Sequence, residues 1–128
     1  MKRGEIDSFI SIKDDFFGIS QVSIKTDIFE TKDGIVIVLE IPGVPKGEIN
    51  LFTDNGKIVI SGVKKERSSN VRYLRVEREF GNFNQIVELP ESVDLDHVEA
   101  EHNAGVLKIT VPWLAKNRNK LLTRVTIK

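Results

Sequence analysis

The chain lacks cysteine, and among its 128 residues it has only two histidines. Without cysteine there is no disulfide framework, no thiolate nucleophile and no cysteine-based zinc site, so a reducing compartment is the default. The two histidines, His97 and His102, stand five positions apart and would face opposite ways on one extended strand. They cannot bind one metal ion together there, and we expect the protein to hold no metal and no cofactor.

A surplus of charge of either sign is also missing. Nineteen basic and nineteen acidic residues give a formal net charge of +0 at pH 7. Nucleic-acid-binding domains usually carry a basic surplus, so this balance argues against a nucleic-acid partner. The basic run Lys116–Lys120 leaves an RNA-binding β-barrel open as an alternative, although a solvated tether is the more common role of such a run.

Long apolar runs are absent as well. No run approaches the roughly 20 residues that a membrane-spanning helix needs. The N-terminal residues 1–5 are not followed by the apolar core of a signal peptide. We therefore expect a cytoplasmic protein with no membrane partner.

Signatures of catalysis are missing too. The sequence contains no Gly-rich phosphate loop, no Gly-x-Ser-x-Gly elbow and no His-Glu-x-x-His motif. Ser68 and Ser69 have no histidine near them in the sequence. Asp94, Asp96 and His97 could bind an adventitious metal ion, but a solvated loop is the more frequent role of such a cluster. We expect no enzymatic activity and no catalytic residues.

What the sequence has in quantity is alternation of apolar and polar residues, which is typical of half-buried strands. Glycine ends three turns between such stretches, at Gly34, Gly56 and Gly105. Repeated short strands joined by tight turns predict a single all-β domain, either an antiparallel sandwich or a small barrel. The expected strands are 24–31, 35–41, 48–53, 57–63, 73–80, 83–89, 98–102 and 106–112.

The hairpin around Gly105 shows this alternation most clearly. Val98, Ala100 and His102 fall on one face of its first strand, with two glutamates on the other face. Its second strand has apolar residues on one face in the same way: Leu107, Ile109 and Val111. Pro112 has no N–H to donate to a neighbouring strand, so pairing should end there.

The alternating stretch Tyr73–Phe80 follows a polar, charged loop over 64–70 rather than a tight turn. A strand on so long a connection is uncommon inside a compact domain and is often functional. It pairs either with a strand of a neighbouring subunit or with its own sheet as an ordinary edge strand. The sequence leaves both readings open.

The N-terminal stretch, from Met1 to about Val22, is weakly patterned and rich in phenylalanine. Four of its apolar residues fit the spacing of a short amphipathic helix: Phe9, Ile12, Phe16 and Ile19. These side chains either cap the core or form an apolar arm that contacts other chains.

The C-terminal tail carries two apolar residues, Val125 and Ile127, which project from the same side in an extended conformation. Such a tail can add to an exposed sheet edge, with its apolar side chains in pockets. Each buried side chain contributes about 1.5–3 kcal/mol before ordering and association losses, so a single contact is weak. Many linked copies are needed to hold an assembly of this kind, and it can exchange subunits.

Several motifs occur together in one order. They are Ile41–Val44 with Lys46–Ile49, Tyr73–Arg78, Glu77–Phe83 running on to Leu89–Pro90, the Ala-x-x-x-x-Gly-Val-Leu pattern over Ala100–Leu107, and Val125–Ile127. Through them the chain, over roughly residues 24–112 and the tail, resembles the small heat shock proteins. These are α-crystallin-domain chaperones of the Hsp20 family, and the resemblance is to their bacterial, archaeal and plant type. Each motif alone is weak, but their common order makes the resemblance specific.

The resemblance implies an immunoglobulin-like antiparallel β-sandwich. It divides the chain into an N-terminal arm (1–22), an α-crystallin domain (23–113) and a C-terminal extension (114–128). It also implies an ATP-independent holdase of the stress response, which binds partly unfolded client proteins and prevents their aggregation. The protein is then expected to form a homodimer and a higher homo-oligomer.

The resemblance further assigns roles to particular residues. The strand expected to add to the partner's 24–31 strand is Tyr73, Leu74, Arg75, Val76, Glu77 and Arg78. The anchor residues Val125 and Ile127 are expected to dock in a neighbour's groove, formed by Ile49, Leu51, Val98 and Ala100. From their density in a polar arm, the residues interpreted as client contacts are Phe9, Phe16 and Phe17.

Three positions depart from the family pattern. Ala104 replaces the polar residue usual before the signature glycine, which weakens the turn. Gln85 stands where many relatives have arginine, so no charge-pair role carries over. Val125 is one methyl group smaller than isoleucine and should lower the affinity of the anchor.

The main alternative is a monomeric co-chaperone or adaptor domain built on a similar sandwich.

Overall fold

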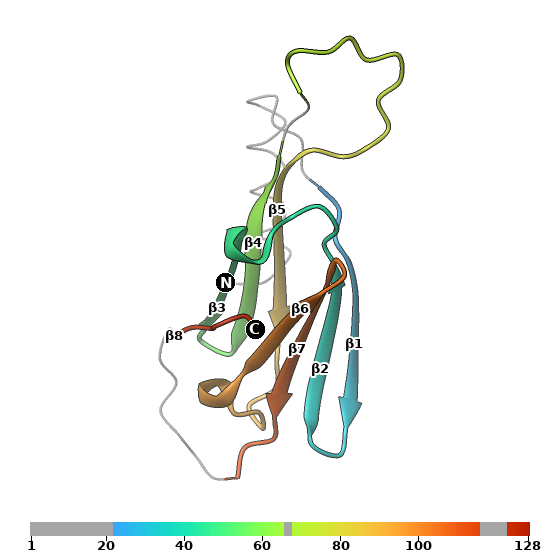
Figure 1. The fold of residues 1–128 in the computed structure, drawn as a ribbon. Coiled ribbons are helices and arrows are strands. Elements are labelled where there is room, and N and C mark those ends of the chain that lie inside the picture. The colour runs from blue at the N-terminus through green and yellow to red at the C-terminus, as the bar shows by residue number, and fades with distance from the viewer. Residues whose placement is uncertain (1–21, 66–67, 116–122) are drawn as a thin grey trace.

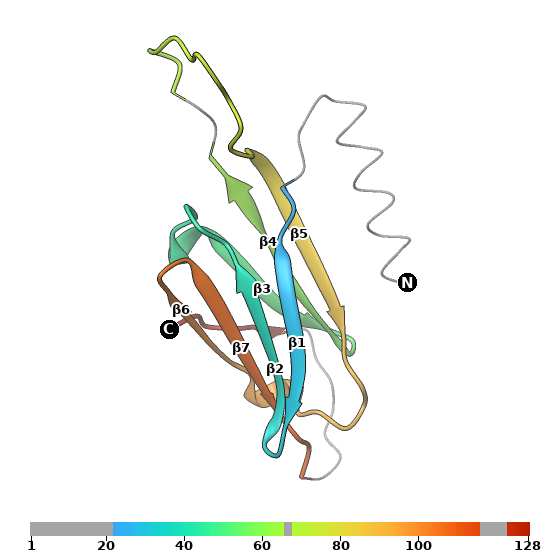
Figure 2. The same cartoon turned by 90° about the vertical axis from the view of Figure 1, so that its right-hand side faces the viewer.

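The strands of the protein form two antiparallel sheets that pack face to face (Figures 1 and 2). A computed structural model describes residues 22–65, 68–115 and 123–128. Sheet I has the order β1-β2-β7-β6 and sheet II the order β5-β4-β3-β8. The elements are β1 (Lys25–Thr31), β2 (Gly34–Glu40), the 3-10 turn η1 (Lys46–Glu48), β3 (Ile49–Asp54), β4 (Lys57–Lys64), β5 (Gly81–Glu88), the 3-10 turn η2 (Leu95–His97), β6 (Glu99–Asn103), β7 (Val106–Pro112) and β8 (Thr123–Arg124).

The core lies between the two sheets and is almost entirely aliphatic. Alternate residues of each strand point inward, as in β3, where Ile49, Leu51 and Thr53 are buried while the residues between them are not. The side chains with no exposed surface come from both sheets: Ile37, Leu39, Leu51, Ile58, Ile60, Leu107, Ile109 and Val111. Burial of these apolar faces is the main force that holds the sheets together.

Two hairpins have turns in which both central residues adopt positive φ. Asn55 and Gly56 have φ of 48° and 84°, and Ala104 and Gly105 have φ of 53° and 78°. This geometry matches the right-handed twist of the flanking strands, and it suits Asn-Gly well. In the second turn, however, a residue with a Cβ atom and no side-chain hydrogen bond occupies the left-handed region. Ala104 therefore carries conformational strain that Asn55 does not.

The tip of the Ala104–Gly105 hairpin packs against the loop after β2. Ile41 N donates to Gly105 O at 2.8 Å, and a Cβ atom on Gly105 would lie 3.2 Å from Pro42 Cα. A side chain at this position would be strained by its φ of 78° and would also lie tight against Pro42. The contact fixes the hairpin onto the end of the neighbouring strand.

The end of β7 is tied to the loops beside it. Asp94 N donates to Pro112 O at 2.8 Å, Trp113 N to Asp33 O at 3.1 Å and Leu114 N to Ser92 O at 2.6 Å. Three neighbouring residues are thus held by backbone hydrogen bonds just before the chain leaves the sandwich. The start of the C-terminal extension is therefore held in place on the sandwich.

The predicted all-β sandwich is confirmed, and seven of its expected strands occur with bounds that differ by at most two residues. The exception is the stretch 73–80. Residues 68–80 form no strand in this chain, so the reading of an ordinary edge strand of its own sheet is wrong. A strand needs a hydrogen-bonding neighbour, and this stretch runs out beyond the ends of β4 and β5, where its own sheets offer none (Figure 1). The predicted arm falls almost wholly outside the described residues.

The strained turn leads to a stability prediction. Ala104→Asn should raise the free energy of unfolding by about 0.5–1 kcal/mol, because asparagine tolerates positive φ better than alanine. Asn55→Ala makes the opposite substitution in the other hairpin turn, and it should lower the free energy of unfolding by a similar amount. Urea unfolding at a fixed protein concentration measures both. Equal stability of the Ala104→Asn variant and the parent protein would contradict the proposed strain.

Candidate assembly site

The C-terminal tail crosses from sheet II to sheet I along one side of the sandwich (Figure 1). It pairs first with the edge of sheet II, where β8 lies antiparallel to β3 with Arg124 opposite Phe52. It then reaches the edge of sheet I, where Ile127 forms a parallel bridge with Ala100 of β6. One short segment thereby covers the free edges of two different sheets.

Backbone hydrogen bonds hold the tail on both edges. Val125 N donates to Leu51 O at 2.9 Å on β3. Lys128 N donates to Ala100 O at 2.7 Å, and His102 N donates to Lys128 O at 2.9 Å, both on β6. The tail thus satisfies donors and acceptors that edge strands otherwise leave to solvent.

The side chains of the tail alternate between the core and solvent. Val125 is 8% exposed and belongs to the hydrophobic core cluster, and Ile127 is partly buried against it. Arg124, Thr126 and Lys128 are exposed. Of the four residues predicted to form the anchor groove, two accept backbone hydrogen bonds from the tail, Leu51 and Ala100. These two and Ile49 are buried in the core cluster, and Val98 is half-buried against it.

The tail seen here occupies the groove of its own chain, whereas the sequence predicted docking in the groove of a neighbour. A single chain does not test the second arrangement, which stays a prediction. Both arrangements would use the same backbone groups of Leu51, Ala100 and His102. A tail from a neighbour can therefore bind only where the chain's own tail has left.

One contact of the tail was not anticipated from the sequence. The guanidinium carbon of Arg124 lies 5.0 Å from the centre of the Phe52 ring, and Arg124 Nη2 donates to Asn50 Oδ1 at 3.3 Å. The only sequence signal was a basic residue beside the first anchor position. Its partners could not be read from the sequence because they depend on the register of β8 against β3.

The opposite side of the sandwich has an unpaired edge at β1. Within the described residues, β2 is the only strand that pairs with β1. Two large apolar residues of β1, Ile28 and Phe29, are about half exposed, at 49% and 47%. An exposed apolar edge strand is a ready template for another strand.

The predicted dimer strand lies in the extended loop that leaves the sandwich beyond β4 and β5 (Figures 1 and 2). Leu74 is 93% exposed, and Tyr73 and Val76 are also exposed. The Tyr73 hydroxyl accepts a hydrogen bond from Ser68 N at 2.9 Å, and Arg75 pairs with Glu77 at 3.5 Å. These contacts are local and on the surface, so they do not fix the loop to either sheet.

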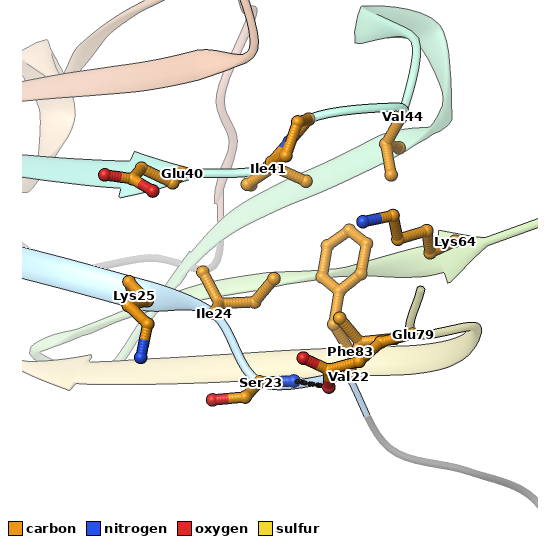
Figure 3. A pocket seen from close by; sticks show the side chains of 11 residues that line it. Val22, Ser23, Ile24, Lys25, Glu40, Ile41, Val44, Lys64, Glu79 and Phe83 are labelled. Atoms are coloured by element: carbon orange, nitrogen blue, oxygen red, sulfur yellow. Dashed lines mark hydrogen bonds between the residues drawn. The ribbon is translucent and has the colours of Figure 1, made fainter. Parts of the chain in front are cut away.

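A pocket of about 160 Å³ lies between the start of β1 and the start of β5 (Figure 3). Its apolar lining is Val22, Ile24, Ile41, Pro42, Val44 and Phe83, with Lys25, Glu40, Lys64 and Glu79 also around it. Ser23 N donates to Glu79 Oε2 at 3.1 Å, and Val22 N donates to Asn82 O at 2.8 Å. The chain that enters β1 is thereby attached to the far edge of sheet II.

The acidic and histidine residues considered as a metal site have structural contacts. Asp94 Oδ1 accepts from Asp96 N at 3.0 Å and thus caps η2, while Asp94 Oδ2 lies 2.7 Å from His97 Nδ1. Asp94 is buried, so these partners offset the cost of removing its charge from water. In the described part of the chain, no three histidine or acidic side chains gather in a way that suits a metal ion. Nor does any helix there have the length and apolar character to cross a membrane.

Comparison with known proteins places this arrangement in a family. Residues 27–128 match the Hsp20/alpha crystallin family. Heat shock protein 16 of Schizosaccharomyces pombe is 33% identical over 104 residues, which cover 78% of this chain and 73% of that protein. Small heat shock protein C2 of Rickettsia felis is 36% identical over 90 residues, which cover 69% of this chain and 58% of that protein. The match thus spans about three quarters of the first relative and under two thirds of the second.

Solved structures agree with the sequence comparison. A small heat-shock protein from Xylella fastidiosa, reported to have a distinct high order structure, has a TM-score of 0.71 and 31% identity. That match covers 80% of this chain and 95% of the other. The hspA protein of Xanthomonas axonopodis has a TM-score of 0.67 and 33% identity, over 73% of this chain and 96% of the other.

The burial of the tail leads to a second prediction. Val125→Ala should lower the free energy of unfolding by about 1.5 kcal/mol, because it removes two methyl groups from the core cluster. Thr126→Ala is the matched control, since Thr126 is exposed in the same tail and should change stability little. Urea unfolding at one protein concentration compares them, because self-association also affects stability. Equal effects of the two substitutions would show that the tail is not seated in a groove.

Proposed function

The chain belongs to the Hsp20/alpha crystallin family of small heat shock proteins, and on that premise we propose that it is an ATP-independent holdase chaperone. It binds partly unfolded client proteins through apolar surface and prevents their aggregation under stress. It works without catalysis, cofactor or metal, in the cytoplasm. The observation that carries the proposal is the family match over residues 27–128, which extends through the anchor in the tail.

The apolar surface of the sandwich supports a holding role. Large apolar side chains are substantially exposed at several places: Ile28, Phe29, Val63, Val71, Tyr73, Leu74 and Val76. Two of these residues are consecutive on β1 and four lie within residues 71–76. Contiguous apolar exposure is typical of interaction surfaces. The proposed client contacts Phe9, Phe16 and Phe17 lie outside the described residues and rest on the sequence alone.

The first step of assembly is a dimer formed by strand addition. We assign it to the edge of β1 and to residues Tyr73–Arg78 of the partner. β1 offers backbone groups and the half-exposed Ile28 and Phe29, and the partner stretch offers an extended chain with Leu74 exposed. Main-chain hydrogen bonds then supply affinity, and alternate side chains supply register.

The second step joins dimers through the tail. In this step Val125 and Ile127 leave the groove of their own chain and enter the same groove of a neighbour. The exchange makes and breaks equivalent contacts, so the contact energy of each tail is nearly unchanged. The balance is then set by protein concentration and by the number of tails that bind at once.

The holding role is tested by the aggregation of a heated client protein in the absence of ATP. The full-length protein should suppress the rise in light scattering. The Val125→Gly/Ile127→Gly variant should have a smaller mass by light scattering, because its anchor is gone. No protection by the intact protein would rule out the proposed function. An unchanged mass of the double variant would rule out the anchor while leaving the holding role intact.

The dimer strand is tested separately by charge. Leu74→Asp combined with Val76→Asp should convert dimers to monomers, because strand addition would bring these side chains onto the apolar edge of β1. Val63→Asp is the control, since Val63 is an exposed apolar residue on β4. Sedimentation at several protein concentrations gives the dissociation constant of the dimer. Dimers of unchanged strength in the Leu74/Val76 variant would contradict this interface.

A monomeric adaptor domain is the second candidate, and one observation favours it. The tail closes the groove of its own chain, which leaves no vacant groove for a neighbour. An adaptor of this kind would remain monomeric at micromolar concentration and would not protect a range of heated clients. The mass of the intact protein in solution therefore distinguishes the two candidates.

A further inference from the structure

We propose that Arg124 is a specificity-determining residue for tail docking, and that Phe52 and Asn50 on the outer face of β3 form its receptor site. The partner that fits this site is a tail of this chain, or of a second copy, with a cation directly before its first apolar anchor. The inference rests on the proposed use of the tail as an anchor. It adds a second contact surface to the apolar groove.

The register of the tail places Arg124 on the side of β3 away from the groove. Arg124 lies opposite Phe52 in the β3–β8 pairing, and the following residue, Val125, is buried on the inner side. Along β3, the inward residues Leu51 and Thr53 alternate with the outward residues Asn50 and Phe52. The tail therefore has one side chain on the outer face of β3, Arg124, and the next on its inner face, Val125.

Two groups on β3 receive the guanidinium. The Arg124 side chain lies over the Phe52 ring with its guanidinium carbon 5.0 Å from the ring centre, inside the range of a cation–π contact. Nη2 also donates to Asn50 Oδ1 at 3.3 Å. Because Asn50 and Phe52 are two residues apart on one strand, they stand next to each other on its outer face. One planar cation reaches both.

The apolar groove alone offers little discrimination between tails. Any tail with two aliphatic residues separated by one position can fill it, and a difference of one methyl group changes affinity only modestly. The outer contact adds a requirement of a different kind, since a neutral or acidic residue at this position loses the cation–π contact with the Phe52 ring. Specificity is a difference between affinities, and this contact creates one.

Tail peptides provide a direct test. The receptor is the full chain with Arg124→Gln, Val125→Gly and Ile127→Gly, so that its own tail no longer competes for the groove. The ligands are fluorescent peptides of residues 115–128, either unchanged or with Arg124→Gln. A third peptide carries Lys128→Gln, which removes the same charge from an exposed residue that binds β6 through its backbone. Fluorescence anisotropy gives the dissociation constants.

We expect Arg124→Gln to weaken peptide binding about threefold to tenfold. Lys128→Gln should change it less than twofold. On a receptor that also carries Phe52→Leu, the unchanged and Arg124→Gln peptides should bind much more alike, because the ring contact is already lost. This dependence of one substitution on the other identifies the pair, since a general effect of tail charge would persist on both receptors.

The possible failures are distinct. If the unchanged peptide does not bind, the anchor itself is wrong and the inference falls with it. If the peptide binds but Arg124→Gln and Lys128→Gln have equal effects, the anchor stands and the role of Arg124 is overturned. An equal loss from Arg124→Gln on the receptors with and without the Phe52→Leu substitution also overturns it. Thermal unfolding of the Phe52→Leu receptor verifies that it remains folded.

Discussion

The constraint on which the structure depends is the need to close an aliphatic core between two open sheets. Each sheet has two edges, and at an edge both the backbone groups and the inner side chains lie next to water. On one side, the tail covers the edges of β3 and β6 and adds Val125 to the core cluster. On the other side, β1 remains unpaired in the described chain. The side with β3 and β6 therefore has its edges covered, whereas the side with β1 has an edge that is free to pair.

This asymmetry suggests how assembly and folding share the same surfaces. A segment that completes the core of its own chain can complete the core of a second chain equally well, because the contacts are identical. Within one chain the covalent link gives the tail a high effective concentration at its own groove. A neighbour competes only when several tails act together, or when geometry keeps a tail from its own groove. The open β1 edge has no such internal competitor among the described residues.

Most of the sandwich was predictable from local patterns. The alternation in 98–102 and 106–112 gave the faces of β6 and β7, and the Asp54–Gly56 stretch gave the turn between β3 and β4. These features depend on neighbours in sequence, so the sequence alone carries them. The stretch 73–80 alternates equally well but forms no strand here, because alternation indicates a capacity to pair and does not supply a partner.

The candidate site was predictable only in part. The apolar spacing of Val125 and Ile127 predicted docking on an exposed sheet edge, and the family resemblance implied a groove between two strands. The placement of the tail in its own chain could not be predicted, since own and neighbouring grooves are chemically identical. The contact of Arg124 with Phe52 and Asn50 was missed for a related reason. It arises from a pairing register between segments about 70 residues apart, and no local pattern records that register.

The backbone bonds that fix Pro112, Trp113 and Leu114 have a geometric consequence for any assembly. They make the root of the tail a fixed point on the sandwich, and the groove that receives the tail is the other fixed point. Eight peptide units separate Ala115 from Thr123, and at no more than about 3.6 Å each they reach at most about 29 Å. If the tail of one copy binds the groove of another, the start of that tail and the groove must therefore lie within this distance of each other. In the proposed assembly, the tether thus limits the spacing between dimers and the angles between them.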